Sequence, residues 1–383
     1  MLIRTPTLSR ADATAVARVE ELRRQLRIYT TQPRRWVGSL RRTALARAIQ
    51  GSNSIEGIIV NLDDAVAAVE DEEPLDAETE TWRAIVGYRN AMTYVLQLAR
   101  DPHFALNEAL IKSLHFMMTG HDLRTNPGTW RPGVIYVRND STGEIVYEGP
   151  DATEVPTLVT ELVEELARND QGVPALARAA MAHLNLVMIH PFSDGNGRMA
   201  RCLQTLVLAR EGILEPQFAS VEEYLGANTE AYYRVLADVG RGRWDPKADA
   251  QPWLRFMLTA HYRQAITLLS RVKHSEALWA LVEELATADK VPTRSLPALF
   301  EAASGRRLRR GAYLAIAEAP LSEAAATRDL RQLVDAELLE AHGEKRGRYY
   351  RAAPKLAALY QRAPSPRSSA MADPYAEDQP KLN

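Results

Sequence analysis

The chain has 383 residues, of which 46% are hydrophobic and 25% charged, a composition typical of a globular protein with more than one domain. A formal net charge of −2 excludes a whole-chain argument for binding nucleic acid or an acidic membrane, so any such binding must be local. The single cysteine, Cys202, excludes internal disulfides and cysteine metal clusters, and its apolar surroundings predict a packed thiol. Apolar stretches fall short of the roughly 20 residues of a membrane span, and the N-terminus lacks a signal peptide's apolar core. We therefore expect a cytoplasmic protein with no membrane partner.

Helical patterns dominate the first 270 residues. Apolar residues recur three and four apart, as one buried face of a helix requires. The predicted helices cover residues 12–26, 41–49, 77–98, 106–118, 156–168, 174–189, 199–211 and 253–269. The predicted fold class is therefore mainly α.

One stretch before residue 340 predicts a β-hairpin. Residues 134–138 and 144–147 are rich in β-prone side chains, and a turn-rich Asn-Asp-Ser-Thr-Gly connects them. This pattern favours a short two-stranded flap.

The pattern changes near residue 270. Residues 275–299, 311–317 and 321–339 predict short helices, and a basic turn at 342–351 follows between strand-prone residues. Helices that close on a basic hairpin are typical of a winged helix. The polar end after Pro354 can bury little surface, so we expect a disordered tail.

A helix end, a tight turn and a helix start follow one another between residues 190 and 201. Pro191 stops the preceding helix at His190, and Gly195-Asn-Gly197 gives the backbone the freedom for a sharp turn. Backbone N–H groups of a glycine-rich turn, together with a helix N-terminus, form a site for anions.

Charged side chains in the same segment predict phosphate chemistry. Arg198 and Arg201, three residues apart, share one face of the first helical turn, where the helix dipole disfavours cations unless an anion such as a polyphosphate lies between them. The carboxylate of Asp194 would repel phosphates unless a divalent cation, most naturally Mg²⁺, bridged the two. His190 ends a helix, where the dipole raises imidazole basicity, so it could accept a proton from an attacking hydroxyl.

The whole segment, His190-Pro-Phe-Ser-Asp-Gly-Asn-Gly-Arg-Met-Ala-Arg201, resembles the Fic family signature His-Pro-Phe-x-Asp/Glu-Gly-Asn-Gly-Arg-x-x-Arg at every specified position. The resemblance extends from about residue 41 to 258 and includes 128–139 and 147–150. It implies a Fic-type helical bundle and an enzyme that transfers AMP from ATP to a Ser, Thr or Tyr hydroxyl of a target protein. Some relatives transfer UMP, phosphocholine or phosphate instead, and the intact Gly197 favours AMP over phosphate.

The resemblance also implies a role for each matching residue. His190 would be the catalytic base, and Asp194 would hold Mg²⁺. The residues expected to bind the nucleotide are Glu56, His190, Gly195, Asn196, Gly197, Arg198, Met199, Ala200, Arg201 and Tyr233. Tyr232 and Tyr233 fit an adenine pocket or the core equally well. The flap that would pair with an extended target segment consists of Val134, Ile135, Tyr136, Val137 and Arg138.

An upstream segment, Gly51-Ser-Asn-Ser-Ile-Glu-Gly57, has Ser52 and Glu56 one helical turn apart. By itself it favours a helix N-cap at Asn53 with a reciprocal Glu56. Beside the downstream motif it resembles the family's inhibitory pattern Ser/Thr-x-x-x-Glu-Gly/Asn, carried by Ser52, Glu56 and Gly57. The resemblance then implies that Glu56 pairs with Arg201 and blocks productive ATP binding, as in the class with an N-terminal inhibitory helix. Whether the same glutamate also serves AMP removal stays open.

The expected organisation is an N-terminal helical region at 1–100 with the inhibitory motif at 52–57, a Fic core at 101–270, a winged-helix-like domain at 271–355 and a disordered tail at 356–383. The exposed basic residues expected in the third region are Arg328, Arg331, Lys345, Arg346, Arg348 and Arg351. They leave DNA binding, protein docking and a homodimer contact open. The alternative function is a DNA-binding transcriptional regulator whose Fic domain senses nucleotide or modifies the regulator itself.

Overall fold

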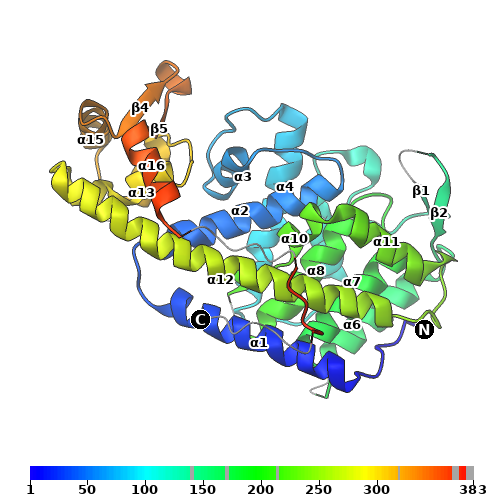
Figure 1. Ribbon diagram of the computed structural model, residues 1–383. Helices are drawn as coiled ribbons and strands as arrows, with labels where there is room; N and C mark the ends of the chain where they lie inside the picture. The colour runs from blue at the N-terminus through cyan, green and yellow to red at the C-terminus, as the bar shows by residue number, and fades with distance from the viewer. Residues whose placement is uncertain (139–141, 169–171, 213–214, 318–319, 365–370, 377–383) are drawn as a thin grey trace.

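The computed structural model describes the chain except for residues 139–141, 169–171, 213–214, 318–319, 365–370 and 377–383. Helices dominate the described part, which confirms the predicted fold class. The 38-residue helix α12 (Gln251–Ala288) crosses the molecule, with α1 (Arg10–Thr31) packed beside it (Figure 1). Among the described helices, none combines the length and apolarity of a membrane span.

Each helix predicted before residue 250 is present. These helices are α1, α2 (Val37–Ile55), α4 (Thr79–Leu98), α5 (Glu108–Thr119), α6 (Val155–Arg168), α7 (Ala175–Ile189) and α8 (Asn196–Arg210). The pattern missed several helices. Some have too few turns to give a periodic signal, namely α3 (Leu62–Val69), α9 (Pro216–Ala219) and α10 (Glu222–Ala227). The pattern also missed α11 (Thr229–Gly240), although this helix is as long as α5.

Helices α7 and α8 form the centre of the bundle. Nearly every side chain of α7 is buried, which explains why its sequence is apolar on all faces rather than on one stripe. Side chains of α8, including the predicted packed thiol Cys202, are fully buried against α4 and α5. The C-terminal end of α7, at His190, and the N-terminal end of α8, at Asn196, are therefore held in place by a packed core.

The predicted two-stranded hairpin is part of a three-stranded sheet. Strand β1 (Tyr136–Arg138) pairs antiparallel with β2 (Ile145–Glu148), and β2 pairs parallel with β3 (Gly242–Arg243). Strand β3 has only two residues, which is too short for a recognisable alternation in the sequence. Because β2 is central, β1 is an edge strand.

The predicted change of domain at residue 271 falls inside α12, and the separate helix predicted at 275–299 is wrong. Buried residues continue along one helix face through Val272, Trp279 and Val282, so α12 extends to Ala288. A C-terminal module, residues 289–363, follows. Its elements are α13 (Leu296–Ala303), α14 (Arg310–Ile316), α15 (Glu323–Asp335), β4 (Leu339–His342), β5 (Tyr349–Ala352) and α16 (Pro354–Arg362). This order of helices before a hairpin is the predicted one, while the assignment as a winged helix stays a prediction.

The predicted disorder at 356–383 is wrong for residues 356–363 and 371–376. Helix α16 buries Leu356 and Leu359. The second segment lies against α1 and α12, where Arg18 donates hydrogen bonds to the carbonyls of Pro374 and Ala376, both at 2.7 Å. Composition gave no sign of this, because hydrogen bonds to backbone carbonyls hold the segment. The remainder of the predicted tail, 365–370 and 377–383, lies outside the described residues.

The C-terminal module contacts the hairpin of α2 and α3 through buried ion pairs. Arg307 donates to Asp63 of α3 at 2.6 Å, and Arg42 of α2 donates to Glu301 of α13 at 2.6 Å. The Glu301 side chain is only 5% exposed, so these charges are largely removed from water. The helix that carries the inhibitory segment therefore touches the C-terminal module directly.

Candidate active site

The loop between α7 and α8 turns at two left-handed residues. His190 ends α7 at φ 51°, and Gly195 precedes α8 at φ 73°, a conformation that glycine adopts without strain. A Cβ at Gly195 would also lie 2.9 Å from Cγ2 of Thr119. Helix α8 begins at Asn196, a few residues earlier than the pattern predicted, so its free N-terminus points into the loop.

His190 has one ring nitrogen fixed and one available. Nδ1 lies 3.0 Å from the carbonyl of Val187, and because a carbonyl only accepts, Nδ1 carries the proton. Nε2 then keeps its lone pair. Burial lowers the pKa of His190, although the Val187 contact and the charge of Glu56 oppose the shift. The net shift of the pKa is downward, whereas the helix dipole alone predicts an upward shift, so the neutral ring is the stable form at neutral pH.

Three predicted nucleotide-binding residues have buried side chains. Asn196 accepts from the N–H of Phe192 at 2.9 Å and donates to its carbonyl at 2.8 Å, so its amide closes the loop on itself. Met199 and Ala200 are fully buried. These side chains are therefore not available to a nucleotide, and the backbone N–H of Met199 already donates to the carbonyl of Gly195 at 2.9 Å.

The two arginines of the motif are buried but incompletely paired. Arg198 is 3% exposed and Arg201 1%. In the described part of the chain, Nε and Nη1 of Arg198 and Nη1 of Arg201 have no hydrogen-bond partner. A buried donor without an acceptor costs about 1–3 kcal/mol or more when it is charged. These atoms therefore mark a space for an anion with several oxygens, such as a polyphosphate.

The upstream segment contacts this space. Arg201 donates from Nε to Oγ of Ser52 at 2.7 Å and from Nη2 to Oε1 of Glu56 at 2.6 Å. Burial is the largest influence and acts to lower the pKa of Arg201, but the charge and hydrogen bond of Glu56, together with the neighbouring Tyr232 and Tyr88, raise that pKa overall. Asn53 lies near the end of α2, and Glu56 caps its C-terminus. The alternative interpretation as a helix N-cap is therefore wrong.

Glu56 lies close over the glycine turn. A Cβ at Gly197 would collide with Oε1 of Glu56 and lie 3.0 Å from Nη1 of Arg201. Gly57, at φ 75°, lets the chain turn away immediately after Glu56. The glutamate, the motif arginine and the predicted phosphate loop thus share one small volume.

Asp194 places one partly exposed carboxylate beside the guanidinium of Arg198. Its side chain is 54% exposed and lies 3.1 Å from Nη2 of Arg198. Among the described residues, no cluster of three or more His, Cys, Asp or Glu side chains could hold a metal. Mg²⁺ binds through one or two carboxylates, substrate phosphates and water, so one exposed carboxylate beside an anion space fits it.

Arg131 joins the base of the flap to the motif. Its guanidinium, 3% exposed, donates to the carbonyls of His190 at 2.8 Å, Gly133 at 2.5 Å and Pro150 at 2.5 Å. The predicted flap residues begin just beyond this anchor. Val134, which precedes the edge strand β1, and Tyr136 within it are both exposed.

The two neighbouring tyrosines differ. Tyr232 is 1% exposed, and its hydroxyl lies 2.9 Å from Nε2 of His183, so it is a core residue. Tyr233 is 46% exposed and donates to the carbonyl of Ile55 at 3.1 Å, beside the inhibitory segment. Only Tyr233 is accessible to a ligand.

The sequence analysis missed buried titratable residues around the loop and around α8. His115 of α5 lies 2.8 Å from the carbonyl of Asp194, and burial lowers its pKa to about 4. Glu222 of α10 is buried beside Thr205, and burial raises its pKa to about 7 although the charge of Arg201 opposes this. Both occur in ordinary helical sequence, which gives no signal for such roles.

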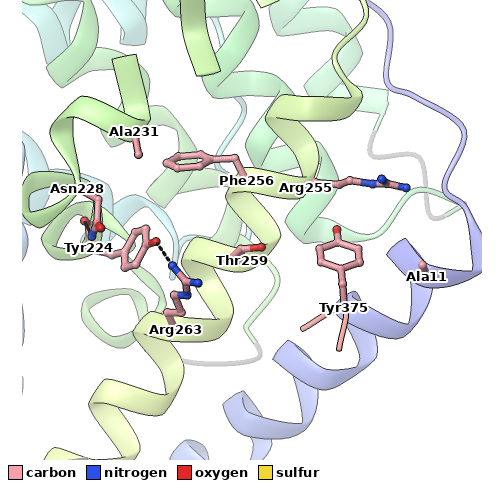
Figure 2. Close-up of a pocket in the computed structure, with 9 residues that line it drawn as sticks. All are labelled: Ala11, Tyr224, Asn228, Ala231, Arg255, Phe256, Thr259, Arg263 and Tyr375. Atoms are coloured by element: carbon pink, nitrogen blue, oxygen red, sulfur yellow. Dashed lines mark hydrogen bonds between the residues drawn. The ribbon is translucent and has the colours of Figure 1, made fainter. Parts of the chain in front are cut away.

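A surface hollow lies away from this site, between α1, α10–α12 and the C-terminal segment (Figure 2). Its two arginines already have partners. Arg263 donates to the Tyr224 hydroxyl at 3.0 Å (Figure 2). Arg255 pairs with Asp12, and its guanidinium lies over the ring of Tyr375. The hollow therefore lacks the unpaired donors found at the motif.

Residues 105–208, which include the loop and both helices around it, match the model of the Fic/DOC family. The chain carries a Fic domain. Among curated proteins, a probable protein adenylyltransferase of Aquifex aeolicus is 34% identical over 181 residues, which cover 45% of this chain and 54% of that protein. Protein adenylyltransferase fic-1 of Caenorhabditis briggsae is 33% identical over 137 residues, 34% of this chain and 22% of that protein.

Solved structures agree on the fold. A Fic family protein from Desulfovibrio desulfuricans G20 superposes with a TM-score of 0.57 at 23% identity, covering 91% of this chain and 98% of that one. A Fic domain containing signaling protein from Bacteroides thetaiotaomicron has the same TM-score at 20% identity, covering 67% of this chain. The chain spans about half or less of the length of the curated relatives described above.

Proposed function

We propose that the protein is a protein adenylyltransferase, which transfers AMP from ATP to a Ser, Thr or Tyr hydroxyl of a target protein. One observation carries the proposal. Among the described residues, buried guanidinium N–H groups of Arg198 and Arg201 lack acceptors. Both arginines lie at the start of α8, directly after the loop that begins at His190, whose Nε2 keeps its lone pair for a proton. The names of the curated relatives support the same activity.

The reaction follows from these groups. The target hydroxyl oxygen attacks the α-phosphorus, its proton moves to Nε2 of His190, and the bond to the β-phosphate breaks to release pyrophosphate. Arg198 and Arg201 stabilise the charge that develops on the leaving phosphates. Asp194 would hold Mg²⁺, which neutralises phosphate charge when bound.

The direct test is incubation of the purified Glu56→Gly protein with ATP labelled at the α-phosphate. We expect label on protein, either on added target or on the chain itself. Label supplied at the γ-phosphate should stay in solution. Protein labelled from the γ-position instead would indicate phosphate transfer and contradict the proposal.

Within this proposal, the chain belongs to the class with an N-terminal inhibitory helix. Glu56 occupies an acceptor position on Arg201 that a γ-phosphate would otherwise take. The same carboxylate could orient water for AMP removal, which would make the balance of the two reactions a property of Glu56.

Replacement of Asp194 by Ala should lower AMP transfer about 100-fold or more, because the nucleotide's cation would lose its protein ligand. The measurement is transfer rate against Mg²⁺ concentration in the Glu56→Gly background. Added Mg²⁺ should not restore the rate. An unchanged Mg²⁺ dependence would remove Asp194 from the metal site.

We propose that an extended target segment pairs with β1. This strand is the edge of its sheet, and its anchor Arg131 bonds the carbonyl of His190. Strand addition at β1 would bring a target hydroxyl toward the base.

The alternative function, a DNA-binding regulator, has support in the C-terminal module. Arg328 and Arg331 are exposed on α15, and Lys345, Arg348 and Arg351 are exposed around the β4–β5 turn. If this face binds duplex DNA, a gel shift at about 50 mM salt should weaken steeply as salt rises. At that low salt concentration, the double variant Arg328→Ala with Arg331→Ala should bind the duplex more weakly than the parent protein. Arg24→Ala, at an exposed position of α1, should leave binding unchanged. No shift at low salt would leave protein docking as the module's role.

A further inference from the structure

We infer that His115 is a positioning residue that fixes Asp194 for its cation. His115 is fully buried in α5, behind the loop and out of reach of a nucleotide. Its Nε2 lies 2.8 Å from the carbonyl of Asp194, and its Nδ1 lies 2.9 Å from the backbone nitrogen of Gly128. The inference deepens the proposed function and rests on it.

The two contacts determine the state of the ring. The N–H of Gly128 can only donate, so Nδ1 must be unprotonated, and the carbonyl of Asp194 can only accept, so Nε2 must carry the proton. His115 is therefore neutral, with one tautomer and one orientation. It links the segment that leads into the flap to the loop that leads into α8.

Further contacts hold the ring in place. It stacks on Phe192 with ring centroids 3.6 Å apart and planes 1° apart, and Phe192 also packs against Trp130. A Cβ at Gly195 would lie 3.4 Å from Nε2. The ring thus forms a floor beneath residues 192–195. Because the peptide of Asp194 is bonded to this floor, the direction of its carboxylate depends on His115.

The two amide replacements of histidine separate the two contacts. In His115→Gln, the side-chain amide reaches the position of Nε2 and can still donate to Asp194. In His115→Asn, the shorter amide reaches only the position of Nδ1, so it can accept from Gly128 but leaves the Asp194 carbonyl unbonded. A role in core packing alone would lower the melting temperature of these variants without changing the Mg²⁺ requirement of either.

The test measures the Mg²⁺ concentration at half-maximal AMP transfer, and Mg²⁺-dependent ATP binding by calorimetry, in the 383-residue chain with Glu56→Gly. We expect His115→Asn to raise both Mg²⁺ requirements about tenfold, the range seen when a residue that orients a metal ligand is lost. His115→Gln should stay close to the parent. Leu114→Ala, fully buried on the same helix, should lower the melting temperature without changing the Mg²⁺ requirement.

Equal Mg²⁺ requirements in the Asn and Gln variants would overturn the inference, as would an unchanged requirement in His115→Asn. Should the Glu56→Gly parent transfer no AMP at all, the proposed function fails. The calorimetric comparison would still judge His115 in that case, because it needs only ATP and Mg²⁺.

Discussion

Replacing Glu56 with glycine should raise AMP transfer by about 10- to 1000-fold, equivalent to roughly 1.4–4 kcal/mol. In the wild-type protein the Glu56 carboxylate lies 2.6 Å from Nη2 of Arg201, a donor that the γ-phosphate of ATP would need. Two anions cannot share this buried guanidinium without strong repulsion, so ATP must bind in a non-productive pose or displace the carboxylate. The measurement is the initial rate of labelling from α-labelled ATP.

A second substitution checks that this gain comes from Arg201. Glu56→Gly with Arg201→Ala should lose the gain, because the liberated arginine is what binds the phosphate. Glu56→Gln keeps the size of the side chain but removes its charge, so we expect an intermediate rate. Circular dichroism should be unchanged, because Glu56 follows α2 rather than forming part of it. If the folded Glu56→Gly protein transfers AMP no faster than the wild type, Glu56 acts only as a helix cap and does not inhibit transfer.

The sequence predicted the parts of this site that lie close together in the chain. The glycines at 195 and 197, the basic pair and the helix end at His190 follow from local backbone rules, and the structure has each of them in the predicted loop. Contacts across long separations were different. Only the resemblance to the Fic family predicted the pairing of Glu56 with Arg201, because the two residues are 145 positions apart and no local rule connects them.

The contacts that hold the inhibitory helix were not predictable at all. A Cβ at Gly226 of α10 would lie 2.7 Å from Cα of Gly51 in α2, so the two helices meet backbone to backbone. In the sequence, a glycine at either position indicates only a lower helix propensity. Its packing role appears only when both helices are seen together. The same applies to Arg131 and His115, whose partners are backbone atoms that no side-chain pattern encodes.

The predicted start of the C-terminal module at residue 271 was wrong for a related reason. The change of pattern near residue 270 predicted a new domain. One helix continues past this point, however, because its buried face continues through Trp279 and Val282. Helix α12 thus belongs to both parts of the molecule. Together with the ion pairs of Arg42 and Arg307, it gives the C-terminal module two connections to the region around the site.

Replacing His190 with alanine should lower AMP transfer by about 10²–10⁴-fold in the Glu56→Gly background while ATP still binds. Nε2 of His190 is the group available to take the hydroxyl proton, because Nδ1 is committed to the Val187 carbonyl. ATP binding should survive, since Arg198 and Arg201 remain. The measurements are the transfer rate and the calorimetric affinity for ATP. Transfer at the parent rate would exclude His190 as the base.

The pH dependence of the Glu56→Gly parent tests the same assignment without changing His190. A base must be deprotonated to act, and burial lowers the pKa of His190 below the ordinary imidazole value of 6.5. The neutral form therefore persists to lower pH than in a free imidazole. Transfer should stay constant from neutral pH down past 6.5 and fall only at more acidic pH. A rate that already falls as the pH drops toward 7 would mean that the base has a raised pKa, and that a group other than this partly buried, neutral His190 accepts the proton.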